Sequence, residues 1–219
     1  KLTDGNAEYS FFDENSAGQL YSVADIPEFS PNTEALHFGA ISLIPEPCGS
    51  AYEEIIARKS KDCVISLDPN IRPSFIKDHD SHRARLERLI LNTDILKVSD
   101  EDLAWIAGPR SQLALIRTWL ENGTSIVLVT KGADGVVAHT SSGTVSRGAV
   151  KAVVVDTIGA GDTFNAGFLA GLRRVGSLKK QALKQLRPEN LLSALDLATN
   201  VAAVTVARAG ANPPWDNEL

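Results

Sequence analysis

The segment from Val153 to Gly167 combines glycines and carboxylates in a spacing that could support chemistry on an anion. Its sequence, VVVDTIGAGDTFNAG, runs from an apolar stretch through a glycine-rich turn into a helical pattern. Small residues before a helix expose unpaired backbone N–H groups, and such groups bind phosphate. Gly159 and Gly161 permit the close approach that a nest of N–H groups needs, and Ala160 keeps the turn small.

A carboxylate closes the same turn. Asp162 would not attract an anion, so its position favours a role as a base beside the phosphate. A helix-capping aspartate is the structural alternative, but the whole string from Asp156 to Asp162 favours a phosphate site. A P-loop is excluded because no lysine follows a glycine pair at the required spacing. A dinucleotide fingerprint is excluded because Phe164 stands where its third glycine would be.

At this string the chain resembles the PfkB/ribokinase family of carbohydrate kinases, whose C-terminal signature is D-T-x-G-A-G-D-x-F followed by a small-residue helix. The resemblance extends over nearly the whole chain and is strongest to bacterial fructokinases. It implies that Asp162 deprotonates a sugar hydroxyl. It also implies that the amides of Gly159, Ala160 and Gly161 hold the charge that develops on the γ-phosphate of ATP. Positioning and electrostatics supply most of the rate of phosphoryl transfer, which agrees with these roles.

Two further motifs follow apolar runs that are typical of buried strands, so they would lie at the carboxyl edge of a parallel sheet. The first is T-K-G-A-D-G, which contains Thr130, Gly132 and Gly135. Its residue types predict a turn, and the resemblance implies that these three residues contact the nucleotide. Arg72 belongs to D-P-N-I-R-P, also a turn by its residues. The resemblance implies that Arg72 neutralises phosphate in the transition state and that Asp68 is structural.

The remaining site assignments depend on weaker patterns. The run S-D-E-D from Ser99 to Asp102 is first of all a helix N-terminus. The resemblance adds a nucleotide contact for Ser99 and a water-mediated magnesium contact for Asp102, although many family members have N-x-x-E here. It places Asn200 beside adenine, with core packing as the alternative, and makes Asp156 the side chain that would bind a monovalent cation such as potassium.

Composition favours a globular protein with small-molecule partners. The chain has 219 residues, of which 43% are hydrophobic, enough for a sizeable core. The net charge is −5, and the scattered lysines and arginines argue against a nucleic-acid surface. Cys48 and Cys63 lack metal-ligand spacing, and no apolar run is long enough to span a membrane. A cytoplasmic location is therefore expected.

Apolar runs alternate with helical patterns along the chain, which predicts a parallel sheet covered by helices. The resemblance specifies a ribokinase-like three-layer αβα sandwich over residues 21–219, preceded by part of a small β lid over 1–20. Strands are expected at 36–43, 63–67, 95–98, 125–130 and 150–155, with a hairpin over 135–146 and a lid strand at 8–12. Helices are expected at 52–58, 81–91, 100–106, 112–121, after the signature turn and from Pro188 towards Gly210.

These features predict an ATP-dependent kinase that phosphorylates a primary hydroxyl of a small sugar, with D-fructose as the first expectation. The alternative acceptors are 2-keto-3-deoxygluconate or another sugar or nucleoside, and the alternative outside enzymes is a noncatalytic nucleotide-binding module. The expected partners are the sugar, ATP and Mg²⁺, with potassium and a homodimer as further expectations. The family's glycine-rich G-G-x-x-x-N segment, which contributes the sugar pocket, is not in this sequence. We therefore expect an N-terminal part of the fold to be missing.

Overall fold

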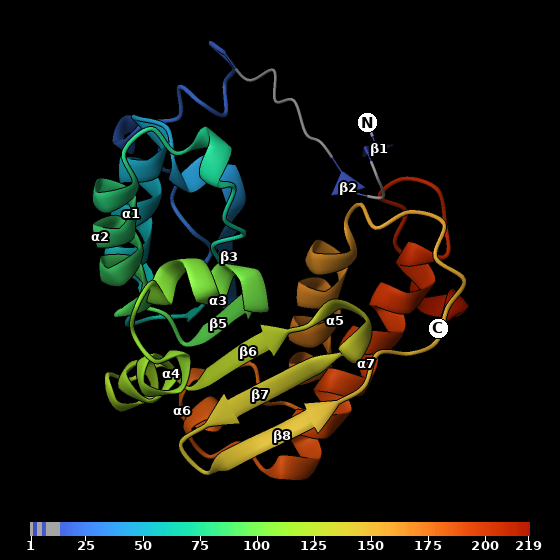
Figure 1. The fold of residues 1–219 in the computed structure, drawn as a ribbon. Helices are drawn as coiled ribbons and strands as arrows, with labels where there is room; N and C mark the ends of the chain where they lie inside the picture. Colours follow the sequence, from blue (N-terminus) through green and yellow to red (C-terminus); the bar gives the residue numbers. More distant parts are fainter. Residues whose placement is uncertain (1, 4–5, 8–13) are drawn as a thin grey trace.

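The computed structural model of the chain describes residues 2–3, 6–7 and 14–219 (Figure 1). The short strands β1 (Leu2–Thr3) and β2 (Asn6–Ala7) form an antiparallel pair. The lid strand expected at 8–12 lies outside the described residues.

A six-stranded sheet forms the centre of the molecule, and its strands follow one another in the order of the sequence. The strands are β3 (Ala35–Gly39), β4 (Val64–Asp68), β5 (Ile95–Ser99), β6 (Ile126–Thr130), β7 (Val136–Thr140) and β8 (Gly143–Arg147). Strands β3 to β6 are parallel, whereas β7 and β8 are antiparallel to their neighbours. The carboxyl ends of β3 to β6 therefore lie at one edge of the sheet, where parallel sheets bind ligands.

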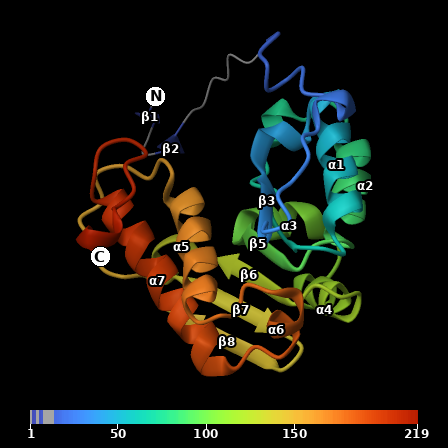
Figure 2. The same ribbon diagram turned by 180° about the vertical axis from the view of Figure 1, so that it is seen from behind.

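Helices cover both faces of the sheet. They are α1 (Cys48–Lys59), α2 (His79–Ile90), α3 (Asp100–Ala107), α4 (Gln112–Glu121), α5 (Ala160–Arg174), α6 (Lys180–Lys184) and α7 (Pro188–Val206). Helices α1 to α4 lie on one face and α5 to α7 on the other (Figures 1 and 2). This arrangement confirms the predicted αβα sandwich with a mostly parallel sheet. Across the described ranges, the model contains no helix with the length and apolar character needed to cross a membrane.

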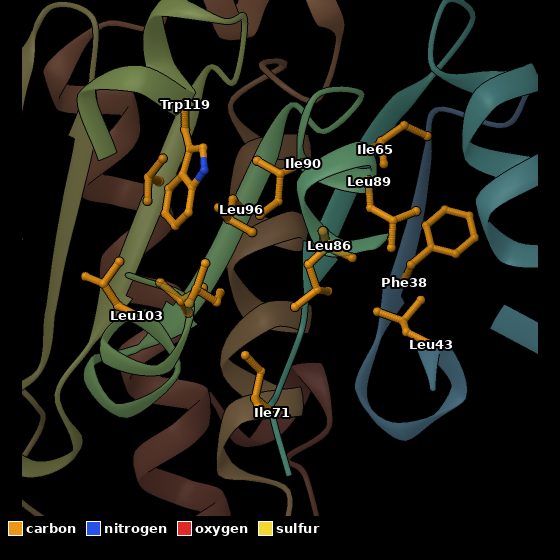
Figure 3. Packing of buried hydrophobic residues seen from close by; sticks show 14 of the residues in the cluster. Phe38, Leu43, Ile65, Ile71, Leu86, Leu89, Ile90, Leu96, Leu103 and Trp119 are labelled. Carbon is orange, nitrogen blue, oxygen red and sulfur yellow. The ribbon is translucent and has the colours of Figure 1, made fainter. Parts of the chain in front are cut away.

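Two apolar clusters hold the layers together, because successive strand residues point to opposite faces. In β4, Ile65 and Leu67 join the cluster beneath α1 to α4, whereas Val64 joins the cluster beneath α5 to α7. Figure 3 shows the first cluster, where Leu96 of β5 meets side chains from the covering helices such as Leu86. Strands buried on both faces explain why β4 to β6 appear in the sequence as nearly continuous apolar runs.

Two of the expected strands differ from the structure. The strand expected at 36–43 ends at Gly39, because Ala40 has a φ of 59° and begins a short 3₁₀ helix (Ala40–Leu43). The strand expected at 150–155 is wrong, and Val153 is 83% exposed. The backbone N–H groups of Val155 and Asp156 donate to the carbonyl of Val206 at the end of α7, which directs this segment away from the sheet.

Candidate active site

The signature turn forms the first turn of α5, as the sequence predicts. Gly159 precedes the helix with φ 77° and ψ 0°, the left-handed conformation that favours glycine. A side chain there would also crowd the chain after α7, because a Cβ on Gly159 would lie 3.0 Å from Cβ of Ala211. A helix start leaves its first backbone N–H groups without helical partners. Here the N–H of Ala160 donates to the carbonyl of Thr157 at 3.3 Å, and Asp162 lies exposed in the same turn. The turn therefore combines an anion-binding helix start with a solvent-accessible carboxylate.

The start of α5 packs against the carboxyl ends of β4 and β5. The side-chain amide of Asn165 donates to Oδ2 of Asp68, the last residue of β4, at 2.8 Å. Nζ of Lys97 in β5 lies 3.3 Å from the position that a Cβ on Gly161 would occupy. The signature turn, the D-P-N-I-R-P turn after β4 and the S-D-E-D run after β5 are thus brought to one region.

A cavity of about 760 Å³ lies next to this region. Its lining includes five of the residues predicted for the site: Thr130, Gly132, Gly135, Ala160 and Gly161. Much of the remaining wall is apolar and includes Phe164, Ala202 and Val206. An apolar wall accommodates a flat ring, and a helix start accepts phosphate, so the cavity has the chemistry of a nucleotide site.

The T-K-G-A-D-G turn between β6 and β7 forms one side of the cavity. Gly135 has a φ of 93°, and a Cβ there would lie 2.1 Å from the carbonyl oxygen of Arg147. Only glycine fits this backbone, so the second glycine of the motif is required by the close approach of the chain at the end of β8. Gly135 is thus required for local packing and also lines the cavity.

Seven predicted residues lie outside the cavity lining: Gly159, Arg72, Ser99, Asp102, Asp156, Asp162 and Asn200. Asn200 is exposed on α7, whereas its neighbour Thr199 lines the cavity. Ser99 caps α3, since its hydroxyl accepts from the backbone N–H of Asp102 at 2.9 Å. Arg72 is half-buried and donates from Nη1 to the carbonyl of Ile71 at 3.0 Å.

Asp102 is buried, with 5% of its surface exposed, and both its oxygens accept backbone hydrogen bonds. Oδ1 accepts from the N–H of Ile71 at 2.8 Å and Oδ2 from the N–H of Ser99 at 3.1 Å. The carboxylate therefore links the start of α3 to the turn that carries Arg72. Over residues 14–219 and the short β1–β2 pair, no group of three or more histidine, cysteine or acidic side chains is placed to hold a metal. The magnesium contact of Asp102 stays a prediction.

Asp156 joins the segment before the signature turn to the chain after α7. Oδ1 accepts from the N–H of Ile158, and Oδ2 accepts from the N–H of Gly210, each at 3.0 Å. These backbone hydrogen bonds lower the pKa of Asp156. The carboxylate is therefore held in its charged form next to the turn, and its role in binding a cation stays a prediction.

Sequence reasoning missed Lys97, whose Nζ lies 3.0 Å from Oδ2 of Asp68. Lys97 is 5% exposed and Asp68 3% exposed, so both charges are buried. The signal is a lysine within the apolar strand Ile95–Ser99, two residues after Ile95 and hence on the face that α5 covers. Histidine 37 lies near this pair: the Nδ1 atom of His37 is 3.0 Å from the hydroxyl of Ser66, and burial lowers its pKa.

Comparison with known proteins identifies the family of the chain. The model of the family described as pfkB family carbohydrate kinase matches residues 4–218. The chain belongs to the pfkB family of carbohydrate kinases.

Within that family, the chain is similar to fructokinases. It is 49% identical over 192 residues to a fructokinase of Rhizobium leguminosarum bv. trifolii, a match that covers 84% of this chain and 59% of that protein. The fructokinase of Xylella fastidiosa with bound ATP has a TM-score of 0.85 at 25% identity, over 95% of this chain and 66% of that chain.

A fructokinase double mutant of Vibrio cholerae O395, in a form with bound fructose, ADP and potassium ion, has a TM-score of 0.77 at 27% identity. That match covers 90% of this chain and 61% of the Vibrio chain. The chain thus spans between 59% and 66% of the length of these three relatives. The solved structures confirm the ribokinase-like fold.

Proposed function

We propose that the protein carrying this chain is an ATP-dependent sugar kinase that converts D-fructose to fructose 6-phosphate. The observation that carries this proposal is the junction between the apolar cavity and the signature turn. Ala160 and Gly161 line the cavity, and Asp162 follows them directly on the exposed side of the helix start. A nucleotide with its base against the apolar wall would direct its phosphates to the amides and its γ-phosphate towards Asp162.

The transfer itself needs a base for the sugar hydroxyl and groups that stabilise the charge on the transferred phosphoryl group. In the proposed reaction, Asp162 takes the proton of the sugar hydroxyl as the hydroxyl oxygen forms a bond to the γ-phosphorus. The bond from that phosphorus to the bridging oxygen of ADP breaks, and ADP leaves with its electron pair. Amides of Gly159, Ala160 and Gly161 stabilise the charge on the transferred group. The guanidinium of Arg72 would donate two hydrogen bonds to the transferred phosphoryl group and neutralise part of its charge.

The acceptor is proposed from the relatives. The Rhizobium protein is a fructokinase, and the Vibrio fructokinase structure holds fructose. A second acceptor class has its own support, because the aminoimidazole riboside kinase of Salmonella enterica has a TM-score of 0.75 at 26% identity. A nucleoside is therefore kept as an alternative acceptor, and 2-keto-3-deoxygluconate stays the alternative predicted from the sequence.

We propose that ATP enters with Mg²⁺ as its complex, since Mg²⁺ is bound largely through substrate phosphates in such sites. In this proposal, Mg²⁺ is bound through the phosphates of ATP. Potassium bound at Asp156 is proposed because the Vibrio structure contains that ion. Residues 1–20 are proposed as part of a lid, 21–219 as the nucleotide-binding and catalytic unit, and the cytoplasm as the location.

A sugar panel tests the proposal. The full-length protein is incubated with MgATP and, separately, fructose, ribose, 2-keto-3-deoxygluconate and aminoimidazole riboside, and ADP release is measured. We expect the highest kcat/KM with fructose, and a phosphate monoester on carbon 6 by ³¹P NMR. Faster turnover of another panel member would replace fructose as the acceptor. ATP binding without turnover of any member would favour the noncatalytic module.

A further inference from the structure

A buried ion pair lies directly beneath the signature turn. The side chains of Lys97 and Asp68 are 7% and 4% exposed, and Nζ lies 3.0 Å from Oδ2. Removing two charges from water costs more than most such pairs regain, so a buried pair is weak evidence for stability alone. Its position at the carboxyl ends of β4 and β5 suggests a role in the chemistry of the sheet edge.

The pair contacts the signature helix at two points. Asn165, which is 5% exposed, donates from its amide to the same Oδ2 of Asp68 at 2.8 Å. The ammonium of Lys97 approaches Gly161 so closely that a Cβ on Gly161 would lie 3.3 Å from Nζ. Because Gly161 has no side chain, the ammonium group of Lys97 can lie next to the backbone of the turn.

The hydrogen bonding of the pair is incomplete. Oδ1 of Asp68 is buried and has no hydrogen-bond partner among the residues that the structure describes. Lysine has three N–H donors, and across these same residues Nζ of Lys97 has one acceptor, Oδ2 of Asp68. A pair evolved for stability would satisfy such buried atoms. This one instead keeps a partly unsatisfied ammonium below the turn amides.

We propose that Lys97 and Asp68 are positioning residues for phosphoryl transfer, a proposal that rests on the kinase function above. Lys97 supplies a buried positive charge beneath the anion-binding amides around Gly161. Asp68 fixes that charge and, through Asn165, fixes the start of α5. In a site shielded from water, such a preorganised charge stabilises the negative charge of the transferring phosphoryl group more strongly than it would in solution.

The chain contains a matched control pair. Nζ of Lys180 in α6 lies 2.7 Å from Oδ1 of Asp94, which directly precedes β5. Asp94 also accepts from the backbone N–H of Ile65 at 2.8 Å, so this pair likewise ties strands to a helix. It lies at the amino end of β5, whereas Lys97 and Asp68 lie at the carboxyl edge, beside the start of α5.

Two double variants test the proposal in the full-length kinase: Lys97→Met with Asp68→Asn, and Lys180→Met with Asp94→Asn. Each removes both charges of a pair, so neither leaves one charge buried alone. We expect the first variant to lower kcat at least about tenfold with a smaller change in KM for ATP, because the charge acts mainly in the transition state. Binding of ADP with aluminium fluoride, which mimics that state, should weaken more than binding of ADP. The second variant should keep kcat within about twofold.

If the first double variant does not fold, Asn165→Ala tests the positioning role instead. Asn165→Ala leaves the charges of Lys97 and Asp68 in place. We expect it to lower kcat several-fold. If the Lys97/Asp68 double variant folds and its kcat equals that of wild type, the positioning role is wrong and the kinase function stands. If that double variant does not fold, a wild-type kcat in Asn165→Ala has the same meaning. A wild-type protein that phosphorylates no sugar would overturn both.

Discussion

At the scale of single residues, three aspartates near the site differ in what their oxygens contact. Both oxygens of Asp102 and both of Asp156 accept backbone N–H groups. Asp162 lies exposed in the first turn of α5, beside the cavity. A general base needs an oxygen that a substrate hydroxyl can reach. Of the three, Asp162 is the carboxylate with that access, whereas Asp102 and Asp156 hold segments of the chain in place.

A buried histidine gives a residue-scale prediction about pH. Burial, together with the nearby charges of Arg85 and His79, lowers the pKa of His82 to about 4. The unfolded chain therefore takes up a proton near pH 6.5 that the folded chain resists until about pH 4. The stability linked to His82 is full above pH 6.5 and is lost as the pH falls towards 4, at up to about 1.4 kcal/mol per pH unit.

Urea unfolding at pH 7 and pH 5 measures this effect. We expect wild type to lose about 2 kcal/mol more than His82→Gln between these values. The pKa values of His37 and His139 are also lowered by burial, so the comparison of variants isolates His82. Exposed His79→Gln should retain most of the wild-type pH dependence, because the charge of His79 is the smallest of the three causes that lower the pKa of His82. Equal pH dependence in wild type and His82→Gln would contradict the account.

At the scale of elements, the signature helix is placed by its close packing on α7. Gly167 and Gly171 are spaced four residues apart and face Ala198 and Ala194 of α7. A Cβ on Gly171 would lie 2.6 Å from Cα of Ala194, closer than real Cβ contacts. The two helices can approach this closely only because these positions lack side chains. Because α5 begins with the signature turn and α7 lines the cavity, this contact positions two walls of the cavity relative to each other.

Gly171→Ala should therefore destabilise the protein, although alanine favours a helix. We expect a loss of about 1–3 kcal/mol from forced separation of the helices, which lowers Tm by several degrees. Gly148→Ala is the matched control, since a Cβ there meets no atom within 4 Å. Thermal unfolding of both variants measures the difference. A Tm for Gly171→Ala equal to that of Gly148→Ala would show that the packing is less tight than described.

At the scale of the whole molecule, the mostly parallel sheet and the motifs that follow its strands were predictable from the sequence. Strands β4 to β6 are nearly continuous apolar runs, and each is followed by polar or glycine residues. The rest depends on contacts between distant segments. The valines at 150–155 have strand propensity, but their backbone bonds to the end of α7. Asn200 and Thr199 differ by one position on a helix, and the sequence does not tell which of them faces the cavity.

In the proposed kinase, the glycine turn and Asp162 form one phosphoryl-transfer centre, in which backbone amides stabilise the phosphoryl charge and the carboxylate accepts the proton. Asp162→Asn tests it most directly, because the amide keeps the shape of the side chain and removes its basicity. ADP release at saturating fructose and the Kd for ATP are measured in wild type and variant. The account predicts a fall in kcat of at least about 100-fold with the Kd for ATP nearly unchanged. Turnover by Asp162→Asn at the wild-type rate would contradict it.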